Sequence, residues 1–193
     1  MNSLRLFSYV VEHDTGFAPN PDHGYCTLAH CKYKKRGKRR NLIEMAQHDN
    51  WVAGTGGADP KKSAGHGKLI YLMRITERMS LEKYWNDPRF REKRPSLNQK
   101  FPGDNKRDRI QKGRFVLISD HFWYFGKKAK ELPPALAKKI EKKGPGYRCQ
   151  SIKPNTVQEL IDWVKRRFPK MGAHGKPCKM PKNVRERRKC PCH

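Results

Sequence analysis

Residues 16–32, GFAPNPDHGYCTLAHCK, combine several residue types that can do chemistry in one short run. The imidazoles and thiols of His23, Cys26, His30 and Cys31 could ligate a metal ion. Cys26 could instead act as a nucleophile if a nearby histidine served as its base. In a third interpretation, prolines stiffen a loop, glycines allow its turns, and Cys26 packs in the core.

The spacing of the cysteines favours the third interpretation. Structural zinc sites usually combine two close ligand pairs at a defined separation. Here four residues separate Cys26 from Cys31, and a second group lies near the C-terminus, at Cys178, Cys190, Cys192 and His193. Nothing in the sequence places a histidine where it could act as a general base for Cys26. We therefore expect a rigid loop with Cys26 packed in the core, and we expect no metal and no cofactor.

A glycine-rich segment, WVAGTGG at 51–57, is the next candidate for chemistry. It lacks the Lys-Ser/Thr ending of a triphosphate loop and does not complete a dinucleotide-binding fingerprint. Its backbone amides and the Thr55 hydroxyl could still bind one phosphate or a base edge. Trp51 either packs in the core or lines a pocket.

Aromatic residues gather at Tyr84 and Trp85 and in the run 122–125, FWYF. Neighbouring strand residues face opposite sides of a sheet, so part of that run would point away from a single core. Rings beside Lys and Arg suit base stacking. The alternative is that helices cover both faces of the sheet and bury every ring. The sequence leaves both possibilities open.

Charge is the main bulk signal. The 193 residues carry 44 Lys and Arg against 18 Asp and Glu, a formal net charge of +26. Such a field attracts polyanions, chiefly nucleic acid or an anionic membrane. A soluble domain with basic tails is the plainer alternative. The chain has no apolar stretch of 18 residues and no pattern typical of a signal peptide, so we expect a cytoplasmic protein.

The elements that would position these residues can be placed from the hydrophobic pattern. Apolar and β-branched runs predict strands near the N-terminus and at 51–57, 68–77 and 115–126. Ser80 could cap a helix that begins at Leu81, and 155–170 has an amphipathic helical pattern. We expect one domain over 1–180, with an exposed polar excursion at 91–114 and a basic tail at 181–193. The predicted class is α+β: a small mixed β-barrel with peripheral helices.

Several strings together resemble a known family. SYVVEHDTGFAPNPDHGYCTLAHCK, WVAGTGG, KLIYLMRITERMSLEKYWNDPRFREKRP, GDN, FVLISDHFWYFG and MGAHGKP resemble the nucleotide modification associated domain of type 2, in that family's order. The chain departs from the family pattern after Asn105, where a longer polar insert usually precedes the last strand. The order of elements is also similar, more loosely, to the PUA-like barrels of EVE and ASCH domains, which bind bases in a pocket beside the barrel.

The resemblance implies a module that binds nucleic acid, DNA in particular, or a modified nucleotide, in a system of DNA base modification or phage conflict. An enzyme using Asp87, Asp104 or Cys26, or a structural subunit of a modification complex, are the alternatives. Combining the family pattern with the aromatic and polar residues above, we predict that the binding residues are Asn20, Thr27, Trp51, Thr55, Tyr84, Trp85, Asp87, Arg89, Asp104, Asn105 and Trp123.

Overall fold

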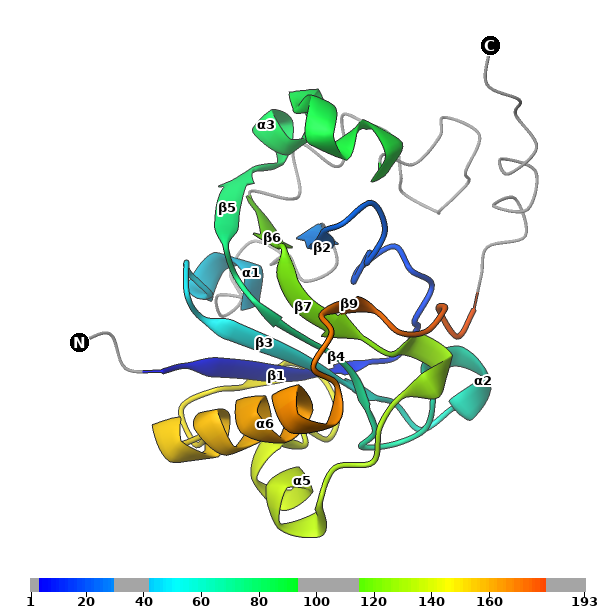
Figure 1. Ribbon diagram of the computed structural model, residues 1–193, viewed down its shortest axis with the longest axis vertical. Helices are drawn as coiled ribbons and strands as arrows, with labels where there is room; N and C mark the ends of the chain where they lie inside the picture. Colours follow the sequence, from blue (N-terminus) through cyan, green and yellow to red (C-terminus); the bar gives the residue numbers. More distant parts are fainter. Residues whose placement is uncertain (1–3, 30–41, 94–114, 180–193) are drawn as a thin grey trace.

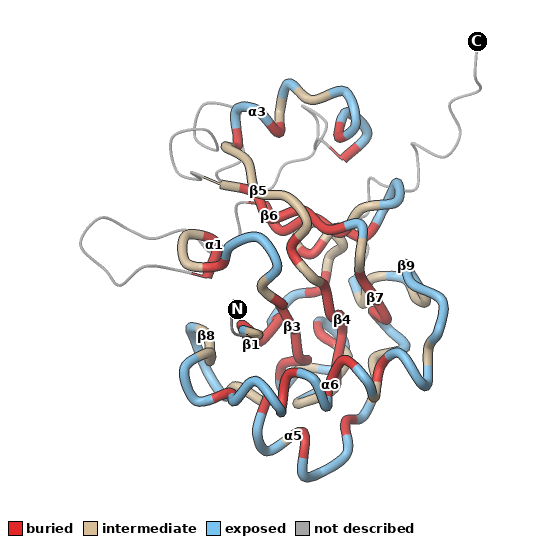
Figure 2. Tube along the Cα trace, turned by 60° about the vertical axis from the view of Figure 1, so that its left-hand side comes forward, coloured by how far each residue is buried: buried red, intermediate tan, exposed pale blue. Residues whose placement is uncertain are grey.

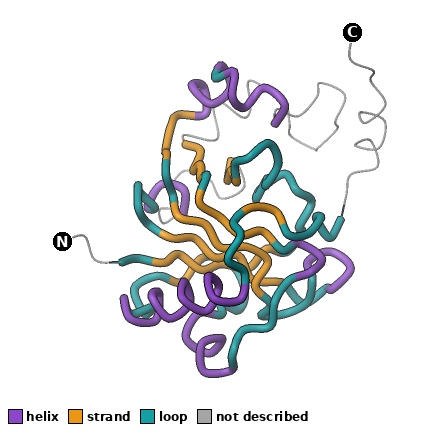
Figure 3. The backbone as a smooth tube through the Cα atoms, viewed as in Figure 1, coloured by secondary structure: helices purple, strands orange, loops and turns teal. Residues whose placement is uncertain are grey.

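The computed structural model describes residues 4–29, 42–93 and 115–179. Two sheets form its centre, and helices flank them (Figures 1 and 3). The strands are β1 Leu6–Val11, β2 Cys26–Ala29, β3 Trp51–Gly56, β4 Leu69–Arg74, β5 Glu77–Ser80, β6 Phe115–Ser119, β7 His121–Tyr124, β8 Tyr147–Arg148 and β9 Gly172–Ala173. The helices are α1 Leu42–Met45, α2 Pro60–Ser63, α3 Leu81–Asn86, α5 Pro134–Ile140 and α6 Pro154–Arg167, with short 3₁₀ helices η1 Pro88–Lys93 and η2 Gly126–Lys128.

The larger sheet has the strand order β8-β1-β3-β4-β7-β9, and the smaller sheet has the order β2-β6-β5. The pairs β1–β3 and β7–β9 are parallel, and the other pairs are antiparallel. The nearly continuous apolar run of β4 lies between β3 and β7, as expected for a strand covered on both faces.

Two of the predicted strands divide between the sheets. The run 115–126 breaks at Asp120, so that β6 belongs to the smaller sheet and β7 to the larger one. The run 68–77 likewise passes from β4 into β5.

The class is therefore mixed α+β, but the small barrel is not confirmed. Among the described strands both sheets are open, since the outermost strands of the larger sheet, β8 and β9, do not pair with each other.

Buried side chains fill three layers. One cluster, which includes Phe7, Tyr9 and Tyr124, lies on the face of the larger sheet toward the smaller one. A second packs α5 and α6 against the opposite face of the larger sheet, and a third packs α3 and η1 against the smaller sheet. Figure 2 shows the strands as the buried centre, with exposed surface along α5 and α6.

Local sequence explains the helix positions. Ser80 caps α3 by accepting a hydrogen bond from the Lys83 amide, as predicted. The amphipathic pattern at 155–170 corresponds to α6, which begins at Pro154 and ends at Arg167. Its buried apolar residues face the larger sheet, so its Lys- and Arg-rich C-terminal turn stays at the surface. No helix in the described part of the chain is both long and apolar enough to cross a membrane.

Most of the predicted polar excursion and all of the predicted basic tail lie outside the described residues, at 94–114 and 180–193. The start of the excursion is described and differs from the expectation at one position. Arg91 and Glu92 are exposed, but Lys93 closes η1 with its side chain buried. A lysine inside a charged run gives no sequence signal of burial, because the acceptors that hold it come from another loop.

Candidate functional site

Three of the predicted binding residues lie inside the larger sheet. Trp51 is 4% exposed and Trp123 is 1% exposed. The Trp123 indole Nε1 donates to the Phe168 carbonyl at 2.7 Å, and the buried Thr55 hydroxyl donates to the Tyr9 carbonyl at 3.3 Å. All four rings of the run 122–125 are buried, because the two faces of the sheet are both covered. This burial argues against the predicted stacking role of Trp51 and Trp123.

A second group of predicted residues meets at the smaller sheet. The Thr27 hydroxyl lies 3.3 Å from the Tyr84 hydroxyl, and both side chains are buried. Asn20 and Thr27 exchange backbone hydrogen bonds of 2.9 Å across the loop that the sequence singled out. The Tyr84 ring stacks on Phe90 with centroids 4.7 Å apart. Loop and helix α3 are thus brought together around one small aromatic core.

Lys93, which the sequence did not single out, fastens this group. Its side chain is 5% exposed. Its Nζ donates to the Asn20 carbonyl at 3.0 Å, to the Asn20 Oδ1 at 3.1 Å and to the Tyr25 carbonyl at 2.7 Å. Burial lowers the pKa of Lys93 to about 8. The three donors of the ammonium group have three acceptors, so the lysine holds the loop in place.

Arg89 forms ion pairs with two acidic residues beside this core, Asp87 and Glu77. Its guanidinium contacts the Asp87 carboxylate at 2.6 Å and the Glu77 carboxylate at 3.0 Å. The hydrogen bonds to Asp87, and then those to Glu77, raise the pKa of Arg89. Asp87 is therefore engaged in an ion pair, which argues against a role as a catalytic base. Trp85 lies half-buried on α3, and Asp104 and Asn105 fall outside the described residues.

Cys26 does not have the properties of an activated nucleophile. It is fully buried on β2, and this burial raises the pKa of its thiol to about 12. The loop before it is shaped as the prolines and glycines predicted: Gly16 has φ +72°, and a Cβ there would lie 2.5 Å from the Cγ atom of Pro177. Across the described ranges, no three His, Cys, Asp or Glu side chains are grouped to hold a metal ion. His30, Cys31, Cys190, Cys192 and His193 lie outside those ranges.

A buried carboxylate, missed by the sequence analysis, ties the loop to the end of the described chain. Asp14 has no exposed surface. It accepts a hydrogen bond of 2.6 Å from the Tyr124 hydroxyl and one of 3.1 Å from the Cys178 amide. Burial raises the pKa of Tyr124, and the Asp14 charge adds to the effect. The contacts span more than a hundred positions of sequence, so no local pattern could have indicated them.

Among the described residues, two open cavities lie at α5 and α6, away from the smaller sheet (Figure 1). A cavity of about 910 Å³, here called the aromatic groove, is lined by Lys68, Ala129, Lys130, Glu131, Leu132, Pro133, Trp163, Arg167 and Phe168. The rings of Trp163 and Phe168 are half-buried, so each keeps some exposed surface. Lys130 lies 5.2 Å from the Phe168 ring centre, and the Arg167 guanidinium lies 5.6 Å from that of Trp163.

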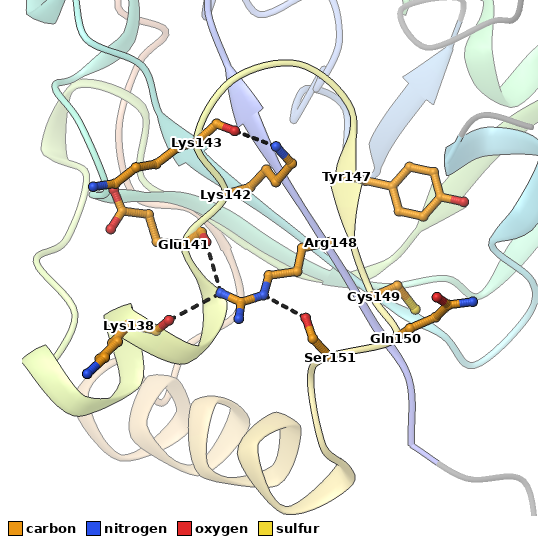
Figure 4. Close-up of a pocket in the computed structure, with 9 residues that line it drawn as sticks. All are labelled: Lys138, Glu141, Lys142, Lys143, Tyr147, Arg148, Cys149, Gln150 and Ser151. Carbon is orange, nitrogen blue, oxygen red and sulfur yellow. Dashed lines mark hydrogen bonds between the residues drawn. The ribbon is translucent and has the colours of Figure 1, made fainter. Parts of the chain in front are cut away.

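A second cavity, here called the Arg148 pocket, encloses about 650 Å³ beyond the C-terminal end of α5 (Figure 4). Its lining residues are Lys138, Glu141, Lys142, Lys143, Tyr147, Arg148, Cys149, Gln150 and Ser151. None of the predicted binding residues lines either cavity. The cations of the aromatic groove come from separate segments, which the packing of α5 and α6 on the sheet brings together. The residues of the Arg148 pocket, in contrast, all lie within 138–151.

Comparisons with known proteins give one result. No curated protein and no solved structure matches this chain. The family described as Nucleotide modification associated domain 2 matches over residues 3–105 and 99–184, which is nearly the whole sequence. The matched range contains the 16–32 loop, the glycine segment 51–57 and the described strands of both sheets. The chain therefore belongs to the Nucleotide modification associated domain 2 family.

Proposed function

We propose that this protein binds nucleic acid, DNA in particular, or a modified nucleotide, and that the base stacks in the aromatic groove. The family description links the chain to nucleotide modification. The observation that carries the proposal is the pairing of partly exposed rings with cations in one open cavity, Trp163 with Arg167 and Phe168 with Lys130.

The groove has the chemistry that a base and its phosphate require. Partly exposed rings can accept any base by stacking, at about 1–3 kcal/mol per base. Lys68, Lys130 and Arg167 supply positive charge at the same rim, opposed by Glu131 alone among the groove's residues, and Glu131 lies 3.3 Å from Lys68. A cavity of this size accommodates a nucleotide, since small-molecule sites fall in the range of roughly 300–1,000 Å³.

The whole chain reinforces this local field. Its formal charge of +26 favours encounter with a polyanion and release of counterions on binding. The PUA-like pocket expected near Asn20, Thr27 and Trp85 is a different location for the same ligand. The structure supports the aromatic groove better, because Thr27 and Tyr84 are buried and Asn20 already holds Lys93.

Fluorescence anisotropy with a short labelled single-stranded DNA tests the proposal. Trp163→Ala should weaken binding roughly fivefold or more, because one stacking platform is lost. Trp85→Ala, a half-buried tryptophan of the alternative location, should leave the affinity within about twofold. Wild-type affinity should fall steeply as salt increases.

A charge variant guards against a folding defect in Trp163→Ala. Arg167→Gln should also weaken DNA binding, whereas Lys61→Gln on α2, which removes one exposed charge that does not line the groove, should have a smaller effect. Equal affinities for Arg167→Gln and Lys61→Gln, with wild-type affinity for Trp163→Ala, would exclude the aromatic groove. If only Trp85→Ala weakened DNA binding, the binding site would lie at α3 instead.

A further inference from the structure

The Arg148 pocket lies at the opposite end of α5 from the aromatic groove. Leu132 and Pro133, which line the groove, directly precede α5, whereas Lys138 and Glu141 of the pocket belong to its last turn and C-cap. A helix of this length, seven residues, spans roughly 10 Å. The two cavities are therefore separate sites, and the pocket needs its own explanation.

Arg148 assembles this pocket from three segments. Its Nε donates to the Ser151 hydroxyl at 2.7 Å, and its Nη1 donates to the carbonyls of Lys138 and Glu141, each at 3.2 Å (Figure 4). The guanidinium thus joins β8, the turn before α6 and the end of α5. Because these bonds fix the charge in advance, an anion that enters pays little to order it.

The charge balance of the pocket favours an anion. Lys138, Lys142 and Lys143 join Arg148 around the cavity, and Glu141 is the one acidic residue among the lining side chains. The Glu141 carboxylate already has a partner, since His66 Nε2 lies 2.9 Å from its Oε1. Lys142 Nζ donates to the Lys143 carbonyl, so its ammonium is held at the rim. Four cations among the lining residues suit a group with more than one negative charge.

We propose that the Arg148 pocket binds a phosphate group. Lysine ammonium groups and a fixed guanidinium form charge-assisted hydrogen bonds with phosphate oxygens. The phosphate could belong to a free polyphosphate or nucleotide, or to the backbone of a strand whose base occupies the aromatic groove. The second source rests on the proposed function, and the first does not.

Titration calorimetry of the full chain with inorganic pyrophosphate tests the pocket directly. The double variant Lys142→Gln/Lys143→Gln removes two cations of the rim. Lys139→Gln/Lys153→Gln is the matched control, because it removes two exposed charges of the same region that do not line the pocket. We expect the pocket variant to weaken pyrophosphate binding about tenfold or more, and the control to stay within about threefold of wild type.

The labelled single-stranded DNA separates the two sources of phosphate. If pyrophosphate competes with DNA and the pocket variant weakens both ligands, the pocket holds a backbone phosphate. If the variant weakens pyrophosphate alone, the pocket holds a free phosphate compound. If the pocket variant and the control behave alike toward both ligands, the proposal is overturned. Trp163→Ala affects only the DNA measurement, so failure of the aromatic groove is seen independently of the pocket.

Discussion

Lysines and aromatic rings occur together in two regions of this protein, with opposite accessibility. At the smaller sheet, Lys93 is buried and its Nζ has three acceptors, while the Tyr84 ring is covered by Phe90. At the aromatic groove, Lys130 and the Trp163 ring keep exposed surface beside an open cavity. The same residue types therefore stabilise the fold in one region and are available to a ligand in the other.

This difference shows that residue type and proximity do not by themselves identify a site. A buried cation whose hydrogen bonds are all made has nothing left to offer a ligand, whereas a half-buried ring under a cation does. Substitutions in the first region should therefore change stability and leave binding intact. Substitutions in the groove should weaken binding and leave stability intact.

The largest loss of stability is expected for Lys93→Met. Methionine keeps most of the side-chain volume but removes the ammonium donor from the Tyr25 carbonyl and from both Asn20 oxygens. The two Asn20 oxygens keep the Thr27 and Asp22 amides as donors. We expect the free energy of unfolding in urea to fall by about 2–4 kcal/mol. Lys83→Met on the exposed face of α3 is the control and should change it by less than about 0.5 kcal/mol. We expect the folded Lys93→Met protein to bind DNA with unchanged affinity. A large loss of affinity would instead place the ligand at the smaller sheet.

The pH dependence of stability should show that folding lowers the pKa of Lys93. Its pKa falls from 10.5 to about 8 on folding, so between those values the unfolded chain binds more protons. Its contribution to stability therefore rises with pH through that window. Urea unfolding of wild type and Lys93→Met between pH 7 and about 9 should show a difference that grows with pH. Comparing the two proteins reduces the opposite trend from Cys26, whose thiol pKa is raised on folding. A constant difference would mean that folding does not lower the pKa of Lys93.

Tyr124→Phe should have the next largest effect. It removes the hydroxyl that donates to the buried Asp14 carboxylate at 2.6 Å, and leaves that oxygen without this donor. We expect thermal or urea unfolding to show a loss of about 1–3 kcal/mol. Tyr147→Phe removes a hydroxyl from a half-buried ring and should cost less than about 0.5 kcal/mol. Equal losses in the two variants would show that the Asp14 contact contributes nothing specific.

The smallest effect is expected for Arg89→Gln. Its ion pairs with Asp87 and Glu77 are short, but the Arg89 side chain is 43% exposed, so water screens them. We expect a change in unfolding free energy of at most about 1 kcal/mol, and less at high salt. A loss as large as that of Lys93→Met would mean that this ion-pair cluster is part of the closed core.

The sequence predicted elements better than it predicted their assembly. Apolar runs placed β1, β3 and β4 correctly, and Ser80 marked the start of α3, because these signals are local. The break at Asp120 was missed, because β6 and β7 read as one apolar run, and only the separate partners of each half reveal two strands. The candidate site was reached only in part: Asn20, Thr27 and Tyr84 do lie together, but around a closed core.

The sequence by itself determined the family, the strongly positive charge and the positions of most described strands, since each is a property of composition or of short-range pattern. Tertiary structure alone decided which cations are buried and which line a cavity. The acceptors of Lys93 lie about seventy positions away. Lys68 and Trp163 line one cavity only because α6 packs against the larger sheet. Accessibility depends on contacts between distant segments, and a local pattern carries no information about them.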